Sequence, residues 1–386
     1  MLKYITNESI CAFYLTMYSL LAPLTHTARG GSSALILMGG LVLCFVATVY
    51  VAHRSRIPIK YHFLFTILCI FGILFGFDYV IRPNEETSNY IYSFLIYGAF
   101  TIFFSAQVVD FKYFLKSYSI LTVICGLIMA RDPLFDYQWS NDYMEFGFTS
   151  MLPAFAGAMI LFTVFKYKIS VLLMCLFFVE LIIFANKGSV LTALVLFIIG
   201  FSFFRNGNKM NKKQITTFVL VLLLLYLYYV DIFLFFVRIA DNLGIASYSL
   251  NTIKIIIDNT NDNIVYDSRL DIWNNALQYF RQNPIIGCGI GYYKSVSEGY
   301  EHNLFLEVLN SWGIVGALLL FVALFKSVSR IFAKNTFSKQ TTVILFLIIA
   351  IIPLLTSMTF WAYQPFWAFI TFSLVNERNI FRNRKL

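Results

Sequence analysis

The sequence predicts an all-α polytopic membrane protein, and three observations carry this prediction. Hydrophobic residues make up 59% of the 386 positions, and charged residues only 13%. The hydrophobic residues come in runs of about twenty, the length at which an α-helix crosses a bilayer. The charged residues gather in short connectors between these runs. A chain of this composition must present most of its apolar surface to lipid.

About twelve such runs follow one another along the chain. The first has only Lys3 ahead of it and no small-residue cleavage site, so we expect an uncleaved first span. No internal repeat relates two halves of the chain, which argues against a transporter. The predicted spans are centred near Ser19, Leu43, Phe71, Leu95, Val123, Ala156, Phe177, Val195, Leu224, Gly316, Ile349 and Phe369.

The connectors alternate in charge, and this alternation predicts the topology. Twenty of the 29 lysine and arginine residues fall in the two termini and the even-numbered connectors. By the positive-inside rule that side is cytoplasmic, together with both termini. The net charge of +9 is therefore a topology signal rather than a sign of nucleic-acid binding.

Three parts of the chain follow from this topology. Residues 1–237 hold spans one to nine, residues 238–302 form one large outer loop, and residues 303–386 hold spans ten to twelve and a cytoplasmic tail. The turn at residues 186–189 and the acidic loop around Asp136 also fall outside. Of six cysteines only Cys288 lies outside an apolar run, so neither a disulfide framework nor a zinc site is predicted.

The large loop contains a predicted amphipathic helix, which Pro284 ends. We expect this helix to lie flat at the lipid headgroups. Its apolar face carries Leu270, Trp273, Leu277 and Phe280. Its polar face carries Arg269, Asn274, Gln278 and Arg281.

A motif follows where the chain re-enters the membrane. His302 and Asn303 are followed by nine residues, Gly313, two residues and Gly316. This H-N-x9-G-x-x-G spacing resembles the signature shared by bacterial O-antigen ligases and O-antigen polymerases. The upstream residues are similar to the large periplasmic loop of that superfamily, and they are Arg269, Trp273, Phe280, Pro284, Gly287 and Gly289. The close resemblance covers residues 267–316.

The resemblance implies a GT-C-like glycosyltransferase of the bacterial inner membrane that needs neither metal nor cofactor. It implies an undecaprenyl-pyrophosphate-linked oligosaccharide as donor, the lipid bilayer as surroundings, and a chain-length regulator protein as a further partner. At the turn of residues 186–189, superfamily members carry an arginine before a glycine. Here the pair is Lys187-Gly188, and a lysine offers a point charge without a bidentate fork.

Cations are the first requirement of such chemistry. A pyrophosphate leaving group at headgroup depth needs positive side chains, and Arg269, Arg281 and Lys187 are the candidates. Roughly three helical turns separate the two arginines. One of them is expected to bind phosphate while the other reaches the lipid headgroups. The alternative for each arginine is an interfacial anchor only.

A base is the second requirement. An imidazole of near-neutral pKa at His302 suits proton transfer from a sugar hydroxyl, and the alternative is a packed interfacial histidine. Glu301 and Glu307 flank it as alternative bases or as groups that orient the ring. Glu307 lies inside a span, where an ionised carboxylate needs a partner. Glu180, Asp78 and Asp231 are predicted to be structural ion-pair partners.

Four aromatic residues are candidates for stacking on sugar rings, namely Trp273, Tyr292, Tyr293 and Tyr300. Their alternative is an aromatic belt at the interface. The series Gly287-x-Gly289-x-Gly291 lacks a βαβ context for dinucleotide binding, so we interpret it as loop flexibility. Gly313 and Gly316 are expected to permit close helix packing.

The sequence thus favours an O-antigen polymerase that transfers a growing glycan to the next lipid-linked repeat unit. An O-antigen ligase, which delivers the glycan to lipid A core, is the alternative within the same class. A composition rich in Phe, Ile, Tyr, Asn and Lys favours the polymerase. A polysaccharide flippase or transporter is the alternative from another class, and it would require functional charges within the spans and broken helices, both of which the sequence shows few signs of.

Overall fold

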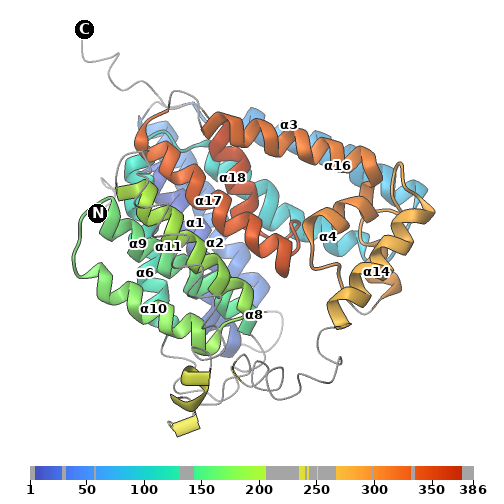
Figure 1. Cartoon of the computed structure of the whole chain (residues 1–386). Helices are drawn as coiled ribbons and strands as arrows, with labels where there is room; N and C mark the ends of the chain where they lie inside the picture. The colour runs from blue at the N-terminus through green and yellow to red at the C-terminus, as the bar shows by residue number, and fades with distance from the viewer. Residues whose placement is uncertain are drawn as a thin grey trace. The chain divides into compact units, whose positions relative to one another are not determined.

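The computed structural model describes residues 5–27, 32–55, 58–130, 143–205, 234–239, 241–242, 250, 267–297, 299–331 and 335–375. Every regular element in these ranges is helical (Figure 1). Among them, seven helices are long and apolar enough to cross a membrane. The prediction of an all-α polytopic membrane protein is therefore confirmed.

All predicted span centres fall within described helices except Leu224, which lies outside the described residues. The helices are α1 (Asn7–Thr27), α2 (Ser32–Ser55), α3 (Tyr61–Ile81), α4 (Thr87–Ser93) with η2 (Phe94–Ala99) and α5 (Phe100–Ala106), α6 (Phe111–Met129), α8 (Tyr143–Glu145) with η4 (Phe146–Met151) and α9 (Leu152–Thr163), α10 (Ser170–Phe184), α11 (Lys187–Arg205), α14 (Asp267–Gln282), α15 (Tyr292–Val296), α16 (Leu304–Ile331), α17 (Phe337–Thr356) and α18 (Gln364–Leu374).

Two predicted spans are shorter in the structure than a perpendicular crossing needs. Helix α10 has 15 residues and α18 has 11, whereas a crossing takes about 20. Helix α17 ends at Thr356, and α18 begins only at Gln364 with Pro365 in its first turn. The full crossing of these two spans stays a prediction.

The chain forms two compact units. The second unit comprises Thr16–Leu41 and Leu115–Val265. Its core is α9, which packs against α10 and α11. Small residues let helices approach closely there, since a Cβ on Gly157 would lie 2.8 Å from the carbonyl oxygen of Ser119. The acidic loop around Asp136 and the position of Asp231 lie outside the described residues.

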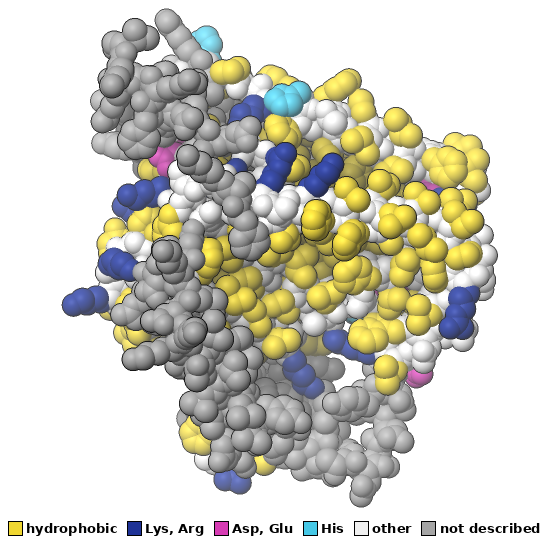
Figure 2. Space-filling model, turned by 45° about the horizontal axis from the view of Figure 1, so that its top comes forward, with side chains coloured by type: hydrophobic (Ala, Val, Ile, Leu, Met, Phe, Trp, Pro, Cys, Tyr) yellow, Lys and Arg dark blue, Asp and Glu magenta, His cyan; other side chains and the backbone are white. Residues whose placement is uncertain are grey.

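The first unit comprises Met1–Leu15, Val42–Phe114 and Tyr266–Leu386. Helices α17 and α18 lie side by side in it, and α14 packs against α16 (Figure 1). Its core is aromatic: Trp361 is fully buried and lies among Phe71, Phe94 and Phe360. Outward-facing apolar side chains cover α3 and α16, and Figure 2 shows a broad apolar face of the molecule. Such a surface is suited to lipid.

Candidate functional site

Helix α16 is broken at Gly313, and the loop between α14 and α15 fills the break. Gly313 has φ 62° and ψ −156°, far from helical values. The amide of Ile314 donates to the carbonyl of Pro284 at 2.9 Å, and the amide of Cys288 donates to that of Asn310 at 2.6 Å. Backbone groups freed by the break thus find partners within the protein, as a membrane-buried helix requires.

Glycine is needed at this junction because two backbones meet there. A Cβ on Gly287 would lie 2.6 Å from the carbonyl oxygen of Asn310, and one on Gly313 would overlap the carbonyl of Ile285. We expected Gly313 to permit close helix packing, but the backbone that approaches it closely is that of a loop. A Cβ on Gly316 would meet only the side chain of Trp312 in its own helix.

The glycine series at residues 287–291 has a more specific role than the flexibility we predicted. Gly287, Gly289 and Gly291 have φ values of 75°, 113° and 76°, which other residues rarely adopt. Arg82 and Tyr90 approach the last two of these glycines. The glycines therefore let the loop turn tightly against its neighbours, a conformational role that the flexibility interpretation did not include.

The end of α3 holds this loop in place. Arg82 forms an ion pair with Asp78, and its Nη1 donates to the carbonyls of Ile286 at 2.9 Å and Gly287 at 2.6 Å. The second carboxylate oxygen of Asp78 accepts from the amide of Ile290 at 3.0 Å. The prediction of a structural ion pair for Asp78 is confirmed. Both Nη nitrogens of Arg82 are thus engaged, while its Nε is buried without a hydrogen-bond partner among the described residues, and Arg82 is a structural residue.

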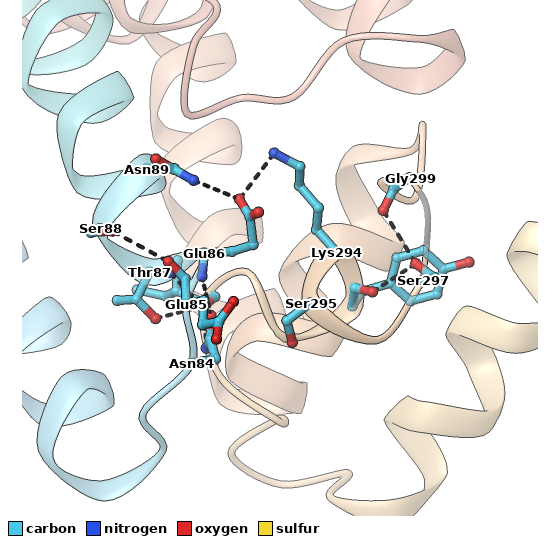
Figure 3. Close-up of polar contacts among 12 residues, drawn as sticks. Asn84, Glu85, Glu86, Thr87, Ser88, Asn89, Lys294, Ser295, Ser297 and Gly299 are labelled. Atoms are coloured by element: carbon cyan, nitrogen blue, oxygen red, sulfur yellow. Dashed lines mark hydrogen bonds and ion pairs between the residues drawn. The ribbon is translucent and has the colours of Figure 1, made fainter.

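The connector after α3 adds a second set of contacts (Figure 3). Asn84 and Thr87 both donate to the carbonyl of Ile290, at 2.9 and 3.2 Å. Glu86 accepts from Asn89 and pairs with Lys294 of α15 at 3.0 Å (Figure 3). These two partners lower the pKa of the Glu86 carboxyl below its usual range. Residues 286–294 are thus bound to the chain at residues 78–87 by side-chain contacts.

Three predicted residues converge on Ser357, the residue that follows α17. Nη2 of Arg269 lies 3.5 Å from the Ser357 hydroxyl oxygen. The hydroxyl of Tyr300 donates to the Ser357 carbonyl, and Nδ1 of His302 lies 3.1 Å from the same oxygen. The rings of Tyr300 and His302 are packed with centroids 4.0 Å apart. The structure therefore brings Arg269, Tyr300 and His302 together.

The contact with Ser357 fixes which ring nitrogen of His302 is free. A carbonyl oxygen can only accept, so Nδ1 must carry the proton in this bond. In the neutral ring Nε2 then keeps its lone pair. Burial lowers the pKa of His302, and the charge of Arg269 lowers it further, while the Ser357 carbonyl opposes both effects. The environment therefore favours the neutral imidazole with an accepting Nε2.

The backbone of His302 is also unusual. Its φ is 52°, in the left-handed region that few residues other than glycine adopt. Strained backbone of this kind is concentrated at functional sites, where the surroundings hold it in place. In this structure the ring contact with Tyr300 and the hydrogen bond to Ser357 stabilise the strained backbone of His302.

Both glutamates beside His302 are buried and hydrogen-bonded. Glu301 accepts from Nδ2 of Asn310 at 3.2 Å, and burial raises its pKa to about 7. Glu307 accepts from the Thr359 hydroxyl and, at 3.4 Å, from the amide of Phe360. Each glutamate is only 3% exposed, so neither faces a free acceptor sugar in this structure. Glu307 joins α16 to the segment after α17.

The aromatic candidates divide into different roles. Tyr293 is buried, and its hydroxyl donates to the carbonyl of Ile272 at 3.2 Å, so its predicted sugar contact is corrected to a packing role. Tyr300 positions His302. Tyr292 is half-buried against Tyr279. The indole N–H of Trp273 is buried and has no hydrogen-bond partner within the described part of the chain.

The two remaining cation candidates are not part of this cluster. Arg281 is exposed in the last turn of α14 and makes no hydrogen bond or ion pair to another described residue. Lys187 is the first residue of α11 and belongs to the second unit, so its predicted phosphate contact stays a prediction. Glu180 is buried in α10 of that unit, and one of its carboxylate oxygens lacks a hydrogen-bond partner among the described residues.

Ser357, Thr359 and Asn310 are site residues that the sequence did not reveal. Ser357 and Thr359 lie in a short polar stretch after α17 that resembles any connector between spans. The sequence feature that could have pointed to them is Pro353, because a proline near the end of a span suggests that the helix stops soon after it. In the structure, the amides of Ser357 and Met358 both donate to the Pro353 carbonyl, and the helix ends there. Asn310 sits inside a span, where an amide side chain needs a partner.

The comparisons with known proteins add one match. Residues 169–321 match the family model described as O-antigen ligase, a range that includes Arg269, Glu301, His302 and Glu307 but not Ser357. Comparison with curated proteins and with solved structures finds no significant match. The matched range, together with the helices of the chain that are long and apolar enough to cross a membrane, supports membership of the O-antigen ligase and polymerase superfamily.

Proposed function

We propose that this protein is an O-antigen polymerase. It would transfer the growing glycan from undecaprenyl pyrophosphate to the next lipid-linked repeat unit, on the periplasmic face of the bacterial inner membrane. The observation that carries this proposal is the meeting of Arg269 and His302 at Ser357. A cation and a neutral imidazole side by side supply the two functions that such a transfer needs.

In the proposed reaction a hydroxyl oxygen of the acceptor sugar bonds to the anomeric carbon of the donor. The bond from that carbon to the pyrophosphate oxygen breaks, and the hydroxyl proton passes to Nε2 of His302. Undecaprenyl pyrophosphate leaves with the bonding electron pair. Arg269 would stabilise the negative charge that develops on it, because its planar fork can hold two phosphate oxygens at once.

The surroundings of Arg269 support this role. Its nearest described polar partner is a neutral hydroxyl at the limit of hydrogen-bond distance, so the guanidinium keeps donors for an anion. Arg82, by contrast, has both Nη nitrogens engaged by Asp78 and two carbonyls, and its Nε is buried. The difference supports Arg269 rather than Arg82 as the pyrophosphate ligand. Arg281 and Lys187 remain proposed secondary cations.

A ligase is the second candidate, because the matched family model itself bears the description O-antigen ligase. Both reactions use the same donor and the same cation and base. They differ in the acceptor, which is a lipid-linked repeat unit for the polymerase and lipid A core for the ligase. The amino-acid composition supports the polymerase.

The deciding experiment supplies both acceptors to the purified protein in bilayers. Lipid-linked repeat units alone should give a ladder of longer lipid-linked glycans, and lipid A core should not be glycosylated. Transfer to lipid A core without a ladder would establish the ligase instead. Neither product, with a correctly folded protein, would contradict both proposals.

The proposed topology has its own test. With both termini cytoplasmic and residues 238–302 in the periplasm, a reporter fused at Asn275 should report the periplasm. A cytoplasmic report would contradict the placement of the site. A chain-length regulator protein is a proposed partner of the polymerase, and co-purification after crosslinking would test it.

A further inference from the structure

The loop between α14 and α15 exposes apolar side chains at its tip, residues 284–286. Ile285 is 66% exposed and Ile286 is 50% exposed. A loop that faces water usually carries polar residues at such positions. Pro284 ends α14, and that role does not explain why two exposed isoleucines follow it.

Contacts within the protein satisfy the carbonyl groups of this tip. The carbonyls of Pro284 and Ile285 accept from the amides of Ile314 and Val315 at 2.9 and 3.2 Å. The carbonyl of Ile286 accepts from Nη1 of Arg82 at 2.9 Å. A carbonyl without a partner is costly in hydrocarbon, so these bonds suit the tip to a place out of water.

The exposed apolar surface of the tip continues onto a membrane-spanning helix. Ile314 and Val315, whose amides bond to the tip, are themselves exposed, and so are Leu318 and Leu319 one turn further along α16. Helix α16 is among the helices long and apolar enough to span a bilayer. The tip therefore adjoins the part of α16 that faces lipid.

The end of α3 flanks the tip on a second side. Val80 and Ile81 are 74% and 58% exposed, and Arg82 directly after them bonds to the carbonyl of Ile286. Helix α3 also meets the length and hydropathy of a membrane span. Exposed apolar residues of two spanning helices thus border residues 284–286.

We propose that residues 284–286 insert among the acyl chains of the bilayer and anchor the large loop in the membrane. The tip follows α14 directly, so its insertion would hold α14, with Arg269, at the depth of the lipid headgroups. The occupant of this surface is lipid, because the surface continues that of two spanning helices. The inference does not depend on the reaction proposed above.

Tryptophan variants test the depth of the tip in the intact protein. Ile285→Trp, and as a control Gln278→Trp on the polar face of α14, are reconstituted into vesicles of phosphatidylcholine or of the same lipid brominated on its acyl chains. The emission that Ile285→Trp adds to that of the wild type should be quenched by the brominated chains. The emission that Gln278→Trp adds should be preserved.

Cysteine labelling gives a second readout. Ile285→Cys and Ile286→Cys should show no labelling above wild type with a charged, membrane-impermeant maleimide in intact vesicles, whereas Gln278→Cys should be labelled. All three variants should be labelled equally after denaturation in detergent. Unquenched emission from Ile285→Trp overturns the proposal whatever the labelling shows. If the emission is unquenched, labelling of Ile285→Cys in intact vesicles would place the tip in water. If the emission is unquenched and Ile285→Cys is not labelled, the tip would lie against protein.

Discussion

Nδ1 of His302 lies 3.1 Å from the carbonyl oxygen of Ser357, and this contact determines what the histidine can do. It leaves Nε2 as the acceptor in the neutral ring. We predict that His302→Gln lowers the transfer rate by about 10²- to 10⁴-fold, because glutamine keeps hydrogen bonding but cannot take a proton. Single-round polymerisation with lipid-linked repeat units measures the rate. A near-wild-type rate would mean that His302 only packs.

The charge of Arg269 acts on His302 as well as on the donor. It contributes to lowering the pKa of His302 below the ordinary 6.5. The base form of His302 is lost as pH falls through this pKa, so wild-type activity should decline only below pH 6.5. Arg269→Gln removes the charge, and its weak residual activity should decline at a higher pH. Arg281→Gln is the matched control and should leave the pH profile unchanged.

The buried carboxyl of Glu301 predicts a pH-dependent stability. Burial raises its pKa from the ordinary 4.5 to about 7, so the folded protein binds a proton here that the unfolded chain has released. This contribution is fully present below pH 4.5 and is lost as pH rises through about 7. Thermal unfolding in detergent should show a weaker pH dependence over this window for Glu301→Gln. An unchanged dependence would show that Glu301 is ionised in the folded state.

The junction at Gly313 predicts a loss of stability on adding one methyl group. Gly313→Ala combines a left-handed φ with overlap on the Ile285 carbonyl and should cost at least about 1–2 kcal/mol. Gly72→Ala in α3 is the control, because a Cβ there meets nothing within 4 Å. Chemical unfolding in detergent compares the two. Equal stability of both variants would mean that the break in α16 can relax at little cost.

Removal of divalent metal should leave the activity unchanged. The resemblance to metal-independent glycosyltransferases motivates this prediction, and the proposed role of Arg269 as the pyrophosphate cation requires it. The assay is polymerisation by purified protein before and after treatment with a chelator. Loss of activity that one divalent metal restores would direct attention to the acidic residues around Asp136.

The sequence by itself determined the class of the protein and located helices that are long and apolar enough to cross a membrane. Apolar runs need lipid or a protein interior, and helices are the structures that satisfy their own backbone there, so run length was enough to locate α2, α3, α16 and α17. The 3.6-residue pattern likewise located α14, which ends at Gln282 before Pro284 as predicted. Arg269 and His302 were predicted as site residues because they belong to a motif that lies within one continuous stretch of chain, where the spacing of residues can be seen directly.

Only the tertiary structure decided how these residues act. Ser357 is 88 positions from Arg269. It contacts Arg269 through its hydroxyl and His302 through its backbone carbonyl, and such groups are too common in connectors to mark a site in the sequence. Tyr293 and Tyr300 look alike in the sequence, yet the first is buried with its hydroxyl bonded to the Ile272 carbonyl, and the second packs against His302. Periodicity reports which face of a helix is apolar. It carries no information on which distant backbone fills a break, as residues 284–289 fill the one at Gly313, because that contact depends on the packing of separate helices.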